Sequence, residues 1–241
     1  PIWLNWPDDE VAHDEGATVV AFGTQDGVRI EREGDIVHVT LATPESRNAQ
    51  SPATWRRLAS VPEILTPEIR AVVLRGEGLS FSAGLDRRML TPEGVPGEES
   101  LLTLASYDEA GMDAFIRGAQ AAFTWWHQVP QATVALVQGH AIGAGFQLAL
   151  ACDFMIVADD AKLAMRETSL GLVPDLGGTA PLVAKVGYGR ALEICARGRY
   201  VEADEAVRLG IAIDQVPVND WPAYTAHLLE PILAAMPDAV S

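Results

Sequence analysis

Three polar residues of this sequence are suited by type and position to proton chemistry. Glu167 follows the segment 161–165, and Asp175 lies in a loop that also carries Gly177 and Gly178. A positioned carboxylate can take a proton from carbon or water and return it, which is general acid–base catalysis. The third residue, Gln147, carries an amide that forms hydrogen bonds but cannot shuttle a proton at ordinary pH. An aspartate in such a loop is also a common turn former, so both roles of Asp175 stay open.

Two glycine-bearing turns offer backbone N–H groups to a developing negative charge. One turn covers residues 82–86 and follows the buried strand 71–74. The other covers 139–145, between the buried strand 133–137 and the start of a helix. Small residues let the backbone approach a ligand closely, and a helix start favours an anion. Two such N–H groups, aimed at one oxygen, predict an oxyanion hole.

The second turn has a competing interpretation. Gly139, Gly143 and Gly145 have the GxxxGxG spacing of a dinucleotide-binding turn, and Asp159 and Asp160 follow the next strand. The turn lies in mid-chain, however, and the strand before it is not the first. The sequence also has no Tyr followed by Lys four residues later, which a short-chain dehydrogenase would use. These observations disfavour a Rossmann domain.

Four segments, in the same order and spacing, resemble the crotonase superfamily, also called the enoyl-CoA hydratase/isomerase superfamily. They are Pro44–Ala49, Phe81–Asp86, Gly139–Asp153 and Ala161–Gly178, and the match runs from about residue 28 to 218. The resemblance implies an α/β fold built as a spiral of ββα units with helices outside. It also implies an acyl-CoA enzyme that forms or protonates a thioester enolate.

The resemblance assigns roles to individual residues. It implies that the oxyanion hole consists of the backbone N–H groups of Ala83 and Ala144. Family hydratases hold one water between two glutamates; here Glu167 matches the second, and Gln147 replaces the first. Asp175 matches an acid–base aspartate of some enoyl- and dienoyl-CoA isomerases. Double-bond isomerisation of an enoyl-CoA is therefore expected, with hydration of a 2-enoyl-CoA and non-catalytic acyl-CoA binding as alternatives.

The resemblance also predicts the contacts of the substrate. Residues that match the CoA- and substrate-binding positions of the family are Arg47, Asn48, Ala49, Ala83, Gly84, Leu85, Asp86 and Gly143. Coenzyme A enters as part of the substrate, and neither a bound cofactor nor a metal is expected. Arginines beside the matching loops could meet phosphates or remain solvated: Arg47, Arg87 and Arg88. About one of four aromatic residues on the next helix is expected to touch the acyl group, the others being core: Phe115, Phe123, Trp125 and Trp126.

The elements that must position these residues alternate between strand and helix, which predicts an α/β fold with parallel crossovers. We expect an irregular N-terminal arm over 1–27 and one domain over 28–241, with a hairpin at 28–31 and 36–41 and a mobile loop at 91–104. Strands are also predicted at 71–74, 133–137, 154–158 and 213–216. Helices are predicted at 52–58, 107–127, 179–186, 190–197, 203–208 and 222–235. One more helix is predicted to run from the glycine turn at 139–145 through residue 151.

Charge and composition limit the partners. The chain of 241 residues has 33 acidic and 17 basic residues, a net charge of −16, which argues against nucleic acid and anionic membranes. Two cysteines, Cys152 and Cys195, form no framework and are expected to pack in a reducing, cytoplasmic setting; His140 is also expected to be structural. Family members continue past a segment like 236–239 with helices that complete a trimer. A homotrimer or dimer of trimers is expected by analogy, and the C-terminal helical segment is missing or truncated here.

Overall fold

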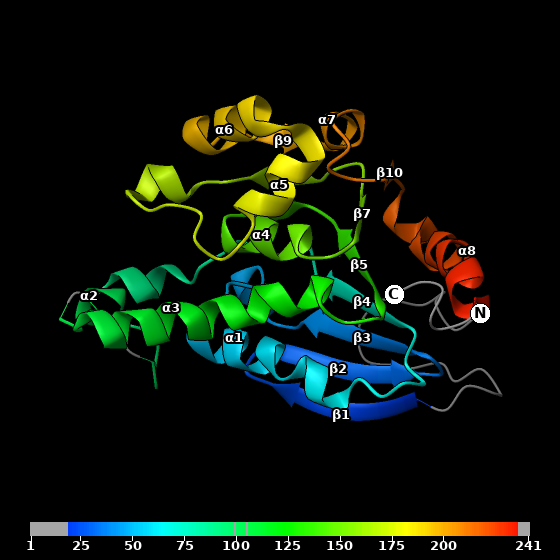
Figure 1. Cartoon of the computed structure of the whole chain (residues 1–241), viewed down its shortest axis with the longest axis horizontal. Helices are drawn as coiled ribbons and strands as arrows, with labels where there is room; N and C mark the ends of the chain where they lie inside the picture. Colours follow the sequence, from blue (N-terminus) through cyan, green and yellow to red (C-terminus); the bar gives the residue numbers. More distant parts are fainter. Residues whose placement is uncertain (1–18, 99, 105, 236–241) are drawn as a thin grey trace.

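A seven-stranded sheet forms the centre of the computed structural model, which describes residues 19–98, 100–104 and 106–235 (Figure 1). The strand order is β1-β2-β3-β4-β5-β7-β10. The first three strands pair antiparallel, and every pairing from β3 to β10 is parallel. The strands are β1 Val19–Gln25, β2 Val28–Glu33, β3 Ile36–Leu41, β4 Ala71–Gly76, β5 Ala132–Val137, β7 Phe154–Val157 and β10 Asp214–Gln215.

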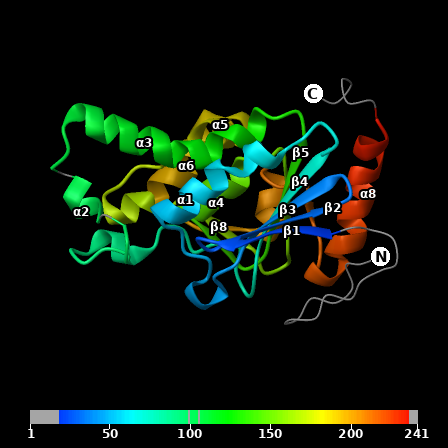
Figure 2. The ribbon, with the colours of Figure 1, turned by 90° about the horizontal axis from the view of Figure 1, so that it is seen from below.

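The parallel strands are buried on both faces, as near-continuous apolar runs predict. In β4, Val72 and Leu74 join the larger core, whereas Ala71 and Val73 join a smaller one on the opposite face. The long helices α1 (Pro52–Ala59) and α3 (Glu109–Thr124) lie on the side of the larger core, and α8 (Trp221–Ala234) covers the smaller one (Figure 2). The sheet is thus a rigid layer from whose strand ends the site loops extend.

A second, three-stranded sheet carries the loops that hold the predicted site. Its order is β6-β8-β9, with β6 and β8 parallel and β9 antiparallel to β8. These strands are β6 His140–Ile142, β8 Lys162–Ala164 and β9 Val201–Glu202. The remaining helices are α2 Leu101–Leu104, α4 Ala144–Leu150, α5 Thr179–Val186, α6 Tyr188–Arg197 and α7 Ala203–Arg208, with 3₁₀ turns η2 Pro44–Ser46, η3 Val61–Ile64, η4 Arg87–Leu90, η5 Trp125–His127, η6 Glu167–Leu170 and η7 Val218–Asp220.

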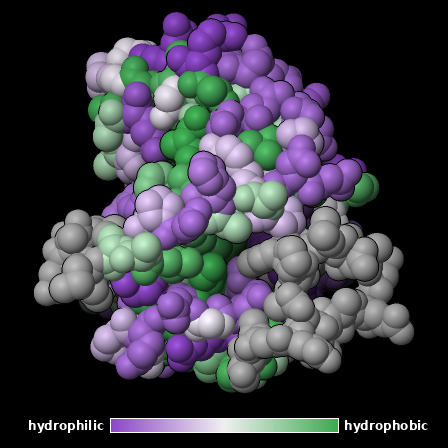
Figure 3. Space-filling model, turned by 90° about the vertical axis from the view of Figure 1, so that its right-hand side faces the viewer, coloured by the Kyte–Doolittle hydropathy of each residue, from purple (hydrophilic) through white to green (hydrophobic). Residues whose placement is uncertain are grey.

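Most predicted elements are present, and the hairpin of β2 and β3 is confirmed. The predicted helix at 52–58 forms as α1, capped by Ser51, whose hydroxyl accepts the N–H of Thr54. Hydrophilic residues cover most of the described surface on the side seen in Figure 3, and hydrophobic residues gather in its middle. This surface agrees with the strongly acidic composition.

Two predictions are wrong in part. The arm predicted over 1–27 contains β1, because Asp26 and Gly27, at φ 53° and 76°, form a tight hairpin turn that pairs β1 with β2; residues 1–18 lie outside the described part. The loop predicted at 91–104 ends in α2. The dinucleotide turn, which the sequence analysis disfavoured, does not form, because β6 stands between β5 and α4 and pairs with β8 in the second sheet.

Candidate active site

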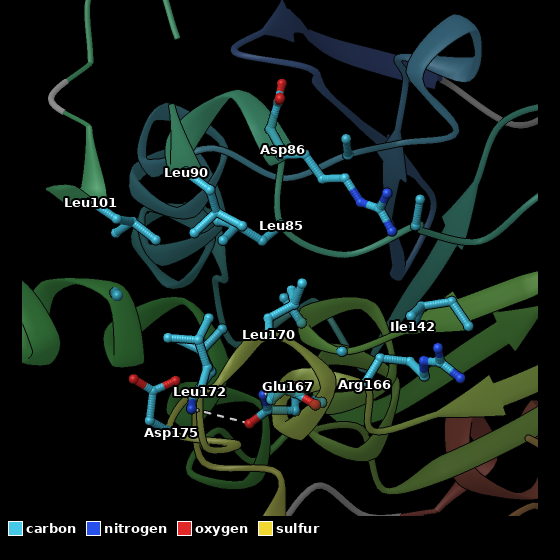
Figure 4. Close-up of a pocket in the computed structure, with 18 of the residues that line it drawn as sticks. Leu85, Asp86, Leu90, Leu101, Ile142, Arg166, Glu167, Leu170, Leu172 and Asp175 are labelled. Carbon is cyan, nitrogen blue, oxygen red and sulfur yellow. Dashed lines mark hydrogen bonds between the residues drawn. The ribbon is translucent and has the colours of Figure 1, made fainter. Parts of the chain in front are cut away.

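A cavity of about 1230 Å³ opens between the two sheets' loops and the pair of helices α2 and α3. Its two ends differ in chemistry. In Figure 4, Leu90 and Leu101 lie at one end above Leu172 and Asp175, and Arg166 lies at the other end. Glu167 lies between these ends (Figure 4). The cavity therefore brings the predicted acid–base residues to the boundary of a polar and an apolar region.

Glu167 is the buried carboxylate of this site. It begins η6, directly after the β8 strand segment, and its exposed fraction is 8%. Its Oε1 accepts a hydrogen bond from Nε2 of Gln147 at 2.7 Å, and its Oε2 is buried with no hydrogen-bond partner within the described part of the chain. Burial raises the pKa of Glu167, and the negative charge of Asp175 raises it further. The free oxygen is thus suited to take up a proton from a substrate.

Gln147 is held by the loop that follows η6. Its Oε1 accepts the backbone N–H groups of Leu176 and Gly178, at 3.0 Å and 3.2 Å. The side chain is almost fully buried on α4. The structure therefore brings Gln147 and Glu167 together, as the sequence predicted.

Asp175 lies in the same loop and lines the same cavity. Its backbone carbonyl accepts a hydrogen bond from Nε2 of Gln120, on α3, at 2.7 Å. Partial burial raises the pKa of Asp175. Figure 4 shows its carboxylate at the same side of the cavity as Glu167, so both acid–base candidates can face one substrate.

The first backbone turn presents the N–H of Leu85. The oxyanion-hole role predicted for Ala83 is therefore wrong, although Ala83 does line the cavity. The N–H of Ala83 donates to the carbonyl of Arg47 at 2.8 Å, so it is occupied by the protein itself. The N–H of Gln50 donates to the carbonyl of Gly84, and the carbonyl of Gln50 accepts the N–H of Asp86. Gln50 thus pairs with the residues on both sides of Leu85, as in a parallel β-ladder. The N–H of the intervening residue then points away from the partner strand. Leu85 lines the cavity, and its N–H has no acceptor among the residues that the structure describes.

The second turn presents Ala144, the first residue of α4, whose N–H has no intrahelical acceptor. The two turns are in direct contact, because a Cβ at Gly84 would lie 2.3 Å from the carbonyl oxygen of Ile142 and 3.5 Å from the nitrogen of Ala144. Gly143, at φ 53°, lies beside the acid–base pair, since a Cβ there would be 3.3 Å from Oε1 of Glu167. Leu85 and Ala144 can therefore offer two N–H groups close to Glu167.

The remaining predicted contacts divide between the cavity and the framework. Arg47, Ala49 and Asp86 line the cavity. Asn48 does not: it is buried, its Oδ1 accepts the N–H of Thr43, and its Nδ2 donates to the carbonyls of Glu77 and Ser80. Gly84 also lies behind the lining. The predictions of Asn48 and Gly84 as substrate contacts are therefore wrong, because both residues fix the turn instead.

The arginines differ in their availability. Arg87 and Arg47 line the cavity, whereas Arg88 lines it but is paired with Asp86 at 2.6 Å. Three residues that the sequence analysis did not assign to the site also line its polar end: His140, Arg166 and Tyr200. The Arg166 guanidinium lies 5.8 Å from the centre of the Tyr200 ring. The sequence held one indication of this group, because Arg166 directly precedes Glu167. His140 and Tyr200 join it only through strand pairing within the second sheet, which the sequence does not show.

The apolar end of the cavity is built by one face of α3. Met112, Phe115, Ile116 and Ala119 follow helical spacing and all line the cavity, together with Leu104 of α2. Of the four aromatic residues considered, Phe115 alone is in the lining; the other three belong to the buried core, namely Phe123, Trp125 and Trp126. Phe115 is therefore the one of the four that is placed to touch an acyl group.

Two further features of the described residues bear on other functions. No group of three or more His, Cys, Asp or Glu side chains that could hold a metal ion occurs in that part of the chain. None of its helices is long and apolar enough to cross a membrane.

Known proteins resemble the whole described domain. A family model described as enoyl-CoA hydratase/isomerase matches residues 31–241. The chain is 31% identical over 199 residues to a probable enoyl-CoA hydratase of Mycobacterium tuberculosis, covering 82% of this chain and 71% of that protein. It is 29% identical over 199 residues to the mitochondrial Delta(3,5)-Delta(2,4)-dienoyl-CoA isomerase of Dictyostelium discoideum, covering 80% and 66%.

Solved structures show the same likeness. A putative enoyl-CoA hydratase from Thermobifida fusca, in complex with acetoacetyl-CoA, superposes with a TM-score of 0.85 at 40% identity, covering 89% of this chain and 83% of that one. The structure of the Thermobifida fusca protein in complex with CoA gives a TM-score of 0.82 at 40% identity, covering 89% and 81%.

Proposed function

Because the chain belongs to the enoyl-CoA hydratase/isomerase family and has its crotonase fold, we propose that it moves the double bond of an enoyl-CoA. Family membership makes it a hydratase/isomerase-type acyl-CoA enzyme rather than a non-catalytic binding protein. One observation carries the choice of isomerisation. Where family hydratases place two glutamates, this chain has a single carboxylate, Glu167, hydrogen-bonded to the amide of Gln147.

The proposed reaction begins with the thioester carbonyl oxygen at the N–H groups of Leu85 and Ala144. The Oε2 atom of Glu167 takes a proton from C2 of a 3-enoyl-CoA. The electron pair of that C–H bond forms the C1–C2 double bond of a dienolate, and the carbonyl π pair moves onto the thioester oxygen. Negative charge on the thioester oxygen is stabilised by the two N–H groups. Glu167 then returns the proton to C4: the C3–C4 π pair forms the new C–H bond, the C1–C2 pair becomes the C2–C3 double bond, and the carbonyl re-forms. This leaves a 2-enoyl-CoA and restores the Glu167 carboxylate. If a protonated Asp175 delivers the proton instead, Glu167 must pass its own proton to Asp175 before the next cycle.

The acyl group that fits the cavity is an apolar chain. Four residues of α3 line this region over eight residues of helix, 112–119, which span about 10 Å. Leu90, Leu101 and Leu104 complete the lining there. Apolar lining favours an acyl chain of medium length without a charged end, because burying a terminal carboxylate among apolar side chains is costly.

Arg47, Arg87 and Arg166 line the cavity and carry charges that can meet the phosphates of coenzyme A. The complexes of the Thermobifida fusca protein with CoA and acetoacetyl-CoA support an acyl-CoA substrate. We also propose that the reaction needs neither a bound cofactor nor a metal. The protein is further proposed to assemble as a homotrimer or dimer of trimers.

Hydration is the second candidate, since the relatives compared above include proteins named as hydratases. It requires two side chains to hold one water and relay its protons. The amide of Gln147 cannot accept a proton, and its oxygen already accepts two backbone N–H groups.

A turnover screen separates the two reactions. The purified protein is incubated with a series of 3-enoyl-CoA and 2-enoyl-CoA thioesters, and products are separated by mass. Hydration adds the mass of one water, whereas isomerisation leaves the mass unchanged. Isomerisation of a 3-enoyl-CoA is expected to exceed hydration of the matching 2-enoyl-CoA; hydration at about 10–10³ s⁻¹, typical of efficient enzymes, would overturn the proposal.

A further inference from the structure

The amide of Gln147 connects three parts of the site, and we propose that Gln147 is a positioning residue that determines which oxygen of Glu167 carries the proton and holds the loop of Asp175. The proposal rests on the proposed function only in taking Glu167 as the proton carrier. It assigns Gln147 no contact with substrate. Its role is to act through Glu167 and the loop.

The hydrogen bonds define the orientation of this amide. One atom of the group accepts two backbone N–H donors, from Leu176 and Gly178, so that atom is the oxygen. The NH₂ group must then face Oε1 of Glu167, 2.7 Å away. An amide NH₂ donates and cannot accept, so Oε1 has to be the acceptor. The mobile proton of Glu167 is left with one place, Oε2, which is buried and has no partner in the described part of the chain.

The same amide holds the catalytic loop. Beyond the two hydrogen bonds, the loop backbone packs directly on this side chain, because a Cβ at Gly178 would lie 2.7 Å from Cγ of Gln147. From the other side, Gln120 of α3 donates to the carbonyl of Asp175. Asp175 is thus held between two amides, and only the amide of Gln147 also contacts Glu167.

A carboxyl group in this place would behave differently. With Gln147→Glu, one oxygen could still accept the two loop N–H groups, but the other would meet Oε1 of Glu167 at hydrogen-bond distance. Two such oxygens need a shared proton, and the pair then titrates as a unit. The other groups that face Glu167 are Asp175, the Cys195 thiol of α6 and the adjoining Arg166. None of these takes the place of the missing amide donor.

The test is the pH dependence of kcat for 3-enoyl-CoA isomerisation. The kcat of wild type is expected to rise with pH as Glu167 ionises and then to stay level. The kcat of Gln147→Glu is expected to fall about 10-fold or more on the alkaline side, where the proton shared by the two carboxylates is lost. The near-isosteric Gln147→Met is expected to lose about 10–100-fold in kcat at every pH, with a smaller change in KM. Circular dichroism and CoA binding establish folding; if Gln147→Met fails to fold, the Gln147→Glu profile still decides.

Two further variants separate the roles. Gln120→Ala releases the loop without touching Glu167, so it is expected to lower kcat and leave the shape of the pH profile unchanged. Gln138→Glu is the matched control, since Gln138 is a buried amide outside the cavity lining whose Nε2 donates to backbone carbonyls. A wild-type pH profile in Gln147→Glu, or wild-type kcat in folded Gln147→Met, would overturn the positioning role. If wild type hydrates instead of isomerising, the proposed function fails, and the same profiles measured for hydration still test Gln147.

Discussion

The part of the cavity around Glu167 and its apolar end are held together by different interactions. Around Glu167, hydrogen bonds fix each group: Gln147 holds the carboxylate, and the loop N–H groups hold Gln147. Around Phe115 and Leu101, the lining consists of half-buried apolar side chains on α2 and α3. Hydrogen bonds are directional and apolar contacts are not. Substitutions around Glu167 should therefore change kcat, and substitutions at the apolar end should change which acyl chain is preferred.

The largest effect is expected for Glu167→Gln. The amide can keep the hydrogen bond to Gln147 but cannot carry a proton, so kcat should fall about 10²–10⁴-fold. Acyl-CoA binding, measured by calorimetry, should be retained. Glu63→Gln, an exposed glutamate outside the cavity lining, is the matched control. An unchanged kcat in folded Glu167→Gln would show that this residue takes no part in the reaction. The proposed contrast between the hydrogen-bonded region around Glu167 and the apolar end would then be wrong.

A slightly smaller effect is expected when a backbone donor is removed. Ala144→Pro places proline at the first position of α4, where a helix tolerates it, and deletes one N–H. We expect kcat to fall about 10²–10³-fold, as for loss of one oxyanion donor, and Leu85→Pro should act similarly. Ala203→Pro, at the first position of α7 outside the cavity, controls for the proline itself. Full activity in folded Ala144→Pro would show that this N–H does not face the thioester.

The choice between Ala83 and Leu85 shows what the sequence could predict. Alternating strands and helices, the glycine turns and the acid–base residues were all visible in the sequence, because each depends on local residue types. Which N–H of residues 82–86 is free depends on pairing with Gln50 and on the carbonyl of Arg47, more than 30 positions earlier in the chain. Local spacing carries no information on such long-range hydrogen bonds.

The same limit explains the other errors. The strand β1 is exposed along its whole length, so its hydrophobic pattern gives little signal. Asn48 was assigned to substrate because it lies in a matching motif, whereas its amide satisfies three backbone groups of the framework. A motif locates the loop, and the side-chain directions within it follow from tertiary contacts.

At the apolar end, two neighbouring leucines allow a matched test. Leu101 lines the cavity, and Leu102 is 55% exposed outside the lining. Leu101→Ala should lower kcat/KM for 3-decenoyl-CoA by about 10-fold, the effect of losing part of one buried apolar contact. The value for 3-hexenoyl-CoA should change little, and Leu102→Ala should change neither. Equal losses for both substrates in Leu101→Ala would mean that the apolar end does not hold the acyl chain.

The smallest expected effect is on stability and comes from the same position as the largest. Burial raises the pKa of Glu167, so folding favours its protonated form. The stability that this group contributes is therefore fully present below the ordinary glutamate pKa of about 4.3 and is lost as pH rises through the higher pKa of the folded state. Glu167→Gln carries no charge and avoids this loss.

The variant should consequently melt at a higher temperature than wild type at neutral pH, and the difference should shrink towards about pH 4, where Glu167 is protonated in both states. A gain of about 1 kcal/mol would appear as a rise in Tm of about 2–4 °C. Thermal melts across this pH range, with Glu63→Gln as control, provide the measurement. A Tm equal to or below that of wild type at neutral pH would show that Glu167 is not held at a cost to stability. A pH-dependent rise in Tm together with a loss of kcat in Glu167→Gln would show that the buried carboxylate lowers stability while it enables proton transfer.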